Sequence, residues 1–157
     1  MEHSFTDWLS GTPFSQAIQL SPWAIPGIQT IHILSLAVLF SAALVLSMRV
    51  LGRGIAAEPL ASVAARFLPP IGICLVLLLV TGALLIIAEP ARTIANPVFY
   101  IKMGLLAFAL GTTLYLRGAA RAATPLTGAH SAAAVAVLLM WAAIMVAGRY
   151  IAYIEPF

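Results

Sequence analysis

The sequence predicts an all-α integral membrane protein: a four-helix bundle with both termini on the outer side of the membrane and an N-terminal interfacial segment. Apolar residues make up 62% of the 157 residues, whereas Asp, Glu, Lys and Arg together make up only 8%. Because a soluble domain carries about 25% charged residues, this composition argues against a soluble enzyme, a disordered chain and a nucleic-acid-binding protein. Four long stretches are almost free of charge, and each approaches the ~20 apolar residues that a helix needs to cross a bilayer.

The N-terminal segment, residues 1–27, mixes aromatic and aliphatic residues with polar ones. Such a segment is typical of a stretch that lies in the membrane interface rather than across it. Within it, Thr12 followed by Pro13 predicts the start of a helix. We expect this segment to lie on the outer leaflet and to cover the outer end of the bundle.

The rest of the chain is predicted to be a single transmembrane domain with spans at 28–48, 67–88, 98–116 and 131–150. Glu89-Pro90 predicts the end of the second span, since helices commonly end before a proline. Asn96-Pro97 predicts the start of the third span, with the asparagine as N-cap and the proline at the first helical position.

Two further prolines, Pro69 and Pro70, are expected in the first turns of the second span. The missing N–H of a proline costs little there, because the first N–H groups of a helix have no intrahelical acceptor.

Basic residues predict the orientation. The connections after the first and third spans carry Arg49, Arg53, Arg66, Arg117 and Arg121. The positive-inside rule places these connections in the cytoplasm, so both termini are predicted to face the periplasm of a bacterial inner membrane. Pairs of small residues four positions apart in the last span indicate close helix packing, within the bundle or in a homo-oligomer.

Three potential cations are predicted to lie at a similar depth. With a rise of about 1.5 Å per residue, His32 lies roughly 5 Å and Lys102 roughly 7 Å inside the outer boundary. Arg149 ends the fourth span at that boundary. Three cations without a matching buried carboxylate indicate an anionic ligand, such as a haem propionate, a phospholipid headgroup or an acidic substrate. The alternative is that Lys102 and Arg149 snorkel to interfacial phosphates.

His32 has two interpretations. A neutral imidazole is tolerated in a bilayer when it donates its N–H to a neighbouring helix. An imidazole nitrogen is also a ligand for haem iron or copper. Met145 is a candidate second ligand because it is predicted near the depth of His32, on a stripe with Trp141 and Arg149 four residues to either side. Such a stripe is more often simple packing.

The stretches TIHILSLAVLF, NPVFYIKMGLL and AGRYIAY, with TDWLSGTPFSQAI near the start, resemble a family of small bacterial four-helix membrane proteins of unassigned function. The pattern is also distantly similar to the copper-resistance protein D family and to the haem-binding, oxygen-independent protoporphyrinogen oxidase. In that oxidase a first-helix histidine ligates haem and a lysine begins the third helix, which His32 and Lys102 match. The oxidase has a histidine just before its lysine, where this chain has Tyr100 and Ile101. The resemblance therefore implies haem binding more strongly than oxidase activity.

These observations lead to three hypotheses. The first is a b-type haem protein that transfers electrons with a quinone or a periplasmic partner. In this hypothesis His32 is an axial ligand and Met145 a possible second ligand. Lys102 and Arg149 neutralise the propionates. The second is a copper transport or tolerance protein that uses His32 and Met145 as metal ligands, with Met103 as a candidate third. The third is a structural or anchoring subunit of a larger membrane complex.

Overall fold

The computed structural model describes residues 2–53, 58–122 and 125–153. Within these ranges the chain is all-α, with seven helices: α1 (Glu2–Ser10), α2 (Pro13–Leu20), α3 (Ala24–Val50), α4 (Leu60–Ala88), α5 (Pro90–Ile94), α6 (Pro97–Ala122) and α7 (Gly128–Tyr153).

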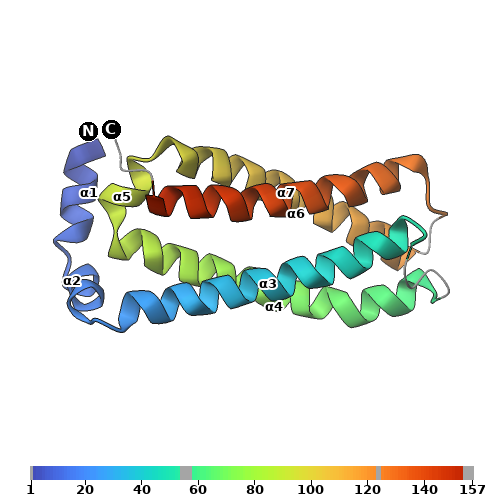
Figure 1. Cartoon of the computed structure of the whole chain (residues 1–157), viewed down its shortest axis with the longest axis horizontal. Helices are drawn as coiled ribbons and strands as arrows, with labels where there is room; N and C mark the ends of the chain where they lie inside the picture. The colour runs from blue at the N-terminus through green and yellow to red at the C-terminus, as the bar shows by residue number, and fades with distance from the viewer. Residues whose placement is uncertain (1, 54–57, 123–124, 154–157) are drawn as a thin grey trace.

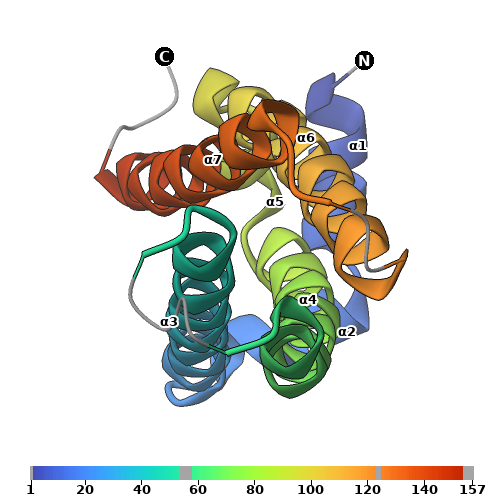
Figure 2. The same ribbon diagram turned by 90° about the vertical axis from the view of Figure 1, so that its right-hand side faces the viewer.

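The four long helices α3, α4, α6 and α7 are each long and apolar enough to cross a membrane, which confirms the four predicted apolar helices. They run alongside one another (Figure 1), and the end-on view in Figure 2 places them at four corners. Helix α3 packs mainly on α4 and α6 mainly on α7, and contacts of α3 with α7 and of α4 with α6 join the two pairs.

The two ends of this assembly differ. At one end, which we call the cap end, α1, α2 and α5 lie across the ends of the long helices, and the last turn of α7 lies there too (Figure 1). The opposite end, the arginine end, holds Arg49, Arg66, Arg117 and Arg121. Glu58 is bound by two of these arginines there: Arg49 Nε donates to its backbone carbonyl, and Arg66 forms a 3.4 Å ion pair with its carboxylate.

Two predicted helix boundaries are confirmed. Helix α4 ends at Ala88, directly before Glu89-Pro90, and Pro90 then begins the short helix α5. Helix α6 begins at Pro97, and the buried Asn96 accepts a hydrogen bond from the Val98 N–H through Oδ1 at 3.0 Å. The N-cap side chain thus satisfies one of the N–H groups that lack an intrahelical partner.

The expectation that Pro69 and Pro70 lie in the first turns of their helix is wrong. Helix α4 begins at Leu60 rather than at residue 67, so Pro69 and Pro70 lie inside the helix and not in its first turns. The added turns form because Val63 and Ala64 are buried against Leu46 of α3 and Ala120 of α6. Burial of these four side chains stabilises helical turns before residue 67, which the charge-free run of the second span alone does not predict.

The other long helices also extend beyond the predicted spans, because helical hydrogen bonding continues past the apolar runs. Helix α3 starts at Ala24 instead of residue 28, α6 extends to Ala122, and α7 runs from Gly128 to Tyr153. The predicted interfacial segment therefore contains two helices, α1 and α2, together with the first turn of α3.

Helix α2 caps the end of α4. It begins as predicted at Thr12-Pro13, where the Thr12 side chain accepts a hydrogen bond from the Ser15 N–H at 3.3 Å. On its inner face the Ser15 hydroxyl donates to the Ile87 carbonyl at 2.7 Å, and Gln19 Nε2 donates to the Ala88 carbonyl at 2.9 Å. Since the last four carbonyls of a helix have no intrahelical donor, α2 satisfies two of them and is thereby fixed to the cap end.

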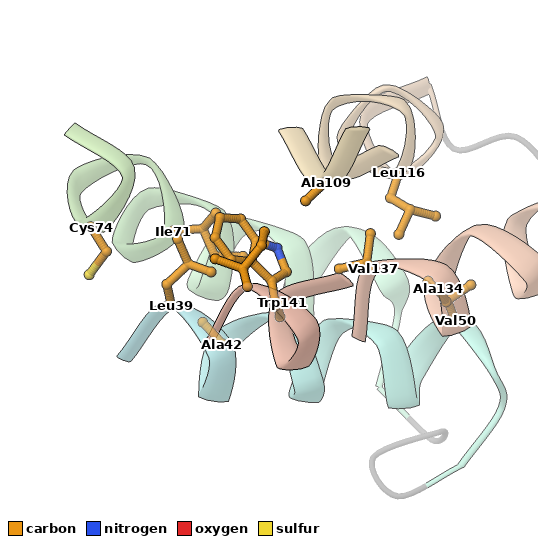
Figure 3. Close-up of a cluster of buried hydrophobic side chains, with 12 residues drawn as sticks. Leu39, Ala42, Val50, Ile71, Cys74, Ala109, Leu116, Ala134, Val137 and Trp141 are labelled. Atoms are coloured by element: carbon orange, nitrogen blue, oxygen red, sulfur yellow. The ribbon is translucent and has the colours of Figure 1, made fainter. Parts of the chain in front are cut away.

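The core lies midway between the ends. Trp141 of α7 is 1% exposed and belongs to a cluster with Leu39, Ile71 and Val137, which Figure 3 shows around the indole ring. Across the described residues, Trp141 Nε1 is the one fully buried side-chain nitrogen or oxygen without a hydrogen-bond partner.

Candidate functional site

Four residues from four different helices come together near the cap end: His32 on α3, Thr81 on α4, Lys102 on α6 and Gly148 on α7. At the cap end, each of these residues lies within about two helical turns of the end of its own helix. His32 and Lys102 are half-buried, and Thr81 is buried.

His32 is tied to the neighbouring helix by a hydrogen bond. Its Nδ1 lies 2.7 Å from Thr81 Oγ1, and Thr81 Oγ1 lies 2.6 Å from the carbonyl oxygen of Leu77, one turn earlier in α4. A threonine hydroxyl has a single hydrogen. If that hydrogen pointed at His32, the hydroxyl and carbonyl oxygens would face each other 2.6 Å apart as two acceptors, which is repulsive.

The Thr81 hydroxyl therefore donates to the Leu77 carbonyl and accepts a hydrogen bond from the Nδ1–H of His32. In a neutral imidazole only one ring nitrogen carries hydrogen, so Nε2 of His32 keeps its lone pair. A Cβ on Gly82 would lie 3.6 Å from Cε1 of His32, so this edge of the ring packs against the backbone of α4. The site thus offers one nitrogen donor of fixed orientation.

Lys102 reaches from α6 toward α7. Its Nζ lies 3.6 Å from the position that a Cβ on Gly148 would occupy. The ammonium is also close enough to His32 to interact electrostatically with the imidazole. In the described part of the chain no hydrogen bond or ion pair engages this ammonium. A half-buried cation without a counter-ion is suited to an anionic group supplied by a ligand.

The other two predicted site residues lie on α7. Met145 is half-buried and lies one turn before Gly148, about 60° from it around the helix axis and about 40° from Arg149. Arg149 is exposed, because it follows Gly148 directly and successive helical side chains diverge by about 100°. The predicted stripe of Trp141, Met145 and Arg149 therefore runs from the core to the surface. The structure brings His32 and Lys102 together and leaves Arg149 on an outer face.

Glu89 and Glu155 could serve as counter-ions for these cations only if the segments that carry them folded back toward the site. Glu89 pairs with Arg92 at 3.3 Å on the surface of the cap end. Glu155 lies outside the described residues. The part of the chain that is described contains no group of three His, Cys, Asp or Glu residues that would hold a metal ion.

Sequence reasoning missed Thr81. One signal pointed to it, because Thr81 is the only hydroxyl-bearing residue in the charge-free run of the second span. A lone hydroxyl in such a run is expected to find a hydrogen-bond partner within its own helix or on a neighbouring one. Its partners are the Leu77 carbonyl and the His32 ring.

His130 lies at the arginine end and takes no part in this site. It is in the first turn of α7, where its Nδ1 accepts a hydrogen bond from the Thr127 backbone N–H at 3.0 Å and contacts the Thr127 hydroxyl at 2.8 Å. Its ring stacks on Tyr115 with centroids 5.3 Å apart. His130 thus closes a variant of the capping box, in which the third helical residue reaches back to the N-cap.

No protein-family model matches this chain, and neither the curated proteins nor the solved structures contain a match to it. The chemistry of the site therefore rests on the side chains themselves: an oriented imidazole on α3 and a lysine ammonium on α6 that lies close to it.

Proposed function

We propose that this protein binds b-type haem and transfers electrons within a bacterial inner membrane, as a four-helix bundle with both termini on the periplasmic side. The observation that carries the proposal is the 2.7 Å contact between His32 Nδ1 and Thr81. Histidines that ligate metals usually donate their other ring N–H to a neighbouring acceptor, which orients the ring. His32 has this arrangement, with Nε2 as the coordinating nitrogen.

The donor set suits haem better than a bare metal ion. A porphyrin supplies four ligands to iron, so one protein imidazole would be enough to hold haem, with Met145 as a candidate second ligand. A copper ion would take its ligands from the protein alone, and His32 and Met145 together provide two. This difference favours haem over the copper alternative.

Lys102 would bind a haem propionate. Its ammonium is half-buried, close to His32 and without an ion-pair partner among the described residues. A charge-assisted hydrogen bond to a carboxylate would offset the cost of holding this cation away from water. Arg149, at the exposed rim of α7, would interact with the second propionate.

The haem iron would supply reversible one-electron transfer when bound. The protein's own contribution is to hold the imidazole in one orientation, to neutralise the propionates and to exclude water through the apolar core below the site. A quinone in the bilayer or a soluble periplasmic protein would be the electron partner.

The test is the absorption spectrum of protein purified from haem-replete cells. We expect Soret and α bands after reduction with dithionite, and iron without stoichiometric copper in metal analysis. A reduced spectrum without these bands would overturn the proposal. Stoichiometric copper in such a sample would support the copper alternative, and stoichiometric co-purification with a larger complex, without either metal, would support the anchoring alternative.

A further inference from the structure

We propose that Thr81 is a positioning residue that holds His32 in the Nδ1–H tautomer before any ligand arrives, so that Nε2 is always the nitrogen presented to the ligand. The inference rests on the proposed function for the identity of the ligand. The assignment of the tautomer does not rest on it.

The first support is that the Thr81 hydroxyl is itself immobilised. Its hydrogen is committed to the Leu77 carbonyl at 2.6 Å, and β-branching restricts the side chain to the rotamers that make this bond in a helix. Thr81 is 4% exposed, so water does not compete for the hydroxyl. The oxygen that faces His32 is therefore a fixed acceptor and cannot serve as a donor.

The second support is that the ring has one hydrogen bond to α4 and lies beside that helix. Nδ1 donates to Thr81, and Cε1 lies beside the next residue, Gly82, 3.6 Å from the position that a Cβ would occupy there. Rotation of the ring by 180° would replace the Nδ1–H at Thr81 by the Cδ2 carbon and leave the hydroxyl without its donor. The hydrogen bond thus selects both the tautomer and the ring orientation.

The consequence for binding is pre-organisation. A ring that carried its proton on Nε2 could coordinate only through Nδ1, which faces Thr81, whereas the Nδ1–H form is ready to coordinate through Nε2. A hydrogen bond from Nδ1–H also makes Nε2 a stronger donor. Loss of such a partner typically weakens metal binding by about 10- to 100-fold.

The direct experiment measures ring ¹⁵N chemical shifts in the full-length protein, labelled at histidine and prepared without haem in detergent micelles. His32 is assigned by the signals that disappear in His32→Ala. We expect protonated Nδ1 and unprotonated Nε2 in the wild type and in Thr81→Ser. In Thr81→Val the Nε2–H form should become populated.

Thr113→Val is the matched control. Thr113 is likewise buried and donates to the carbonyl four residues earlier, at 2.7 Å to Ala109, and it is on α6 away from His32. The control should leave the His32 signals unchanged. His130 provides an internal check on folding, because its signals should stay constant in every variant that folds.

The second readout is titration with haemin. Thr81→Val should bind haemin about 10- to 100-fold more weakly than the wild type, with Thr81→Ser close to the wild type and Thr113→Val unchanged. An Nε2–H tautomer in the wild type, or an unchanged Nδ1–H form in Thr81→Val, would overturn the inference. An altered tautomer with unchanged haemin affinity would also overturn the role in binding. If the wild type binds no haemin, the proposed function fails, while the tautomer result stands on its own.

Discussion

The two ends of the molecule each contain a histidine paired with a threonine, and the two pairs have opposite hydrogen-bond polarity. At the cap end His32 Nδ1 donates to Thr81, whose hydroxyl hydrogen is committed to Leu77. At the arginine end His130 Nδ1 accepts from the backbone N–H of Thr127, so the neutral ring carries its proton on Nε2.

The difference shows that the surroundings of the threonine, rather than the residue pair, decide which ring nitrogen remains available. Thr81 lies inside a helix and its hydroxyl has a carbonyl to donate to. Thr127 is the N-cap residue directly before α7, where a backbone N–H needs an acceptor. His130 therefore serves the end of its own helix, whereas His32 bonds to a neighbouring helix and keeps its Nε2 lone pair.

The largest contrast is expected when each histidine is replaced by alanine. His32→Ala should abolish the haem bands, because it removes the axial ligand. His130→Ala should leave haem per protein unchanged, because His130 lies at the opposite end. The measurement is the reduced-minus-oxidised spectrum at equal protein concentration. Equal loss of haem in both variants would show that His32 acts through folding alone.

The next effect concerns Lys102 and separates a propionate partner from a snorkelling side chain. Lys102→Met keeps the stem and removes the charge, so we expect most bound haem to be lost. Lys102→Arg should lose part of it, since a planar guanidinium does not fit the place of a compact ammonium near Gly148. A snorkelling lysine would tolerate arginine. Full haem occupancy in both variants would reduce Lys102 to an interfacial anchor.

A smaller effect is expected on the stability of the arginine end. His130→Ala removes the acceptor for the Thr127 N–H and the stacking partner of Tyr115. We expect it to lower the free energy of unfolding by about 1 kcal/mol, the usual size of a lost helix cap. The measurement is reversible unfolding in detergent micelles. His130→Asn, which keeps an acceptor near the backbone, should recover part of the loss.

The smallest effect is expected at Trp141, a third polar ring that lies between the two pairs and has no partner for its Nε1. Trp141→Phe removes a buried N–H without an acceptor, which offsets the cost of the smaller side chain. The free energy of unfolding should therefore change by less than about 1 kcal/mol. A loss of about 3 kcal/mol or more would indicate that this N–H is hydrogen-bonded in the membrane.

The sequence allowed His32 and Lys102 to be chosen as site residues, because ionisable side chains in apolar spans are costly and therefore conspicuous. It did not indicate that Thr81 would hold His32, since 49 positions separate them along the chain. Nor did it show that Arg149 turns outward. A stripe with spacing of four residues drifts by about 40° at each step, so Trp141 and Arg149 cannot face the same neighbours.

The sequence by itself determined the number of apolar helices, the caps at Thr12 and Asn96 and the end of α4, because these depend on local hydrogen bonding and on the apolar content of each segment. The tertiary structure decided how each helix is rotated about its axis, and hence that His32 meets Thr81 and Lys102 reaches Gly148. The physical reason is that lipid and protein core are both apolar. The spans are consequently apolar on nearly every face, and their periodicity does not mark the side that turns inward.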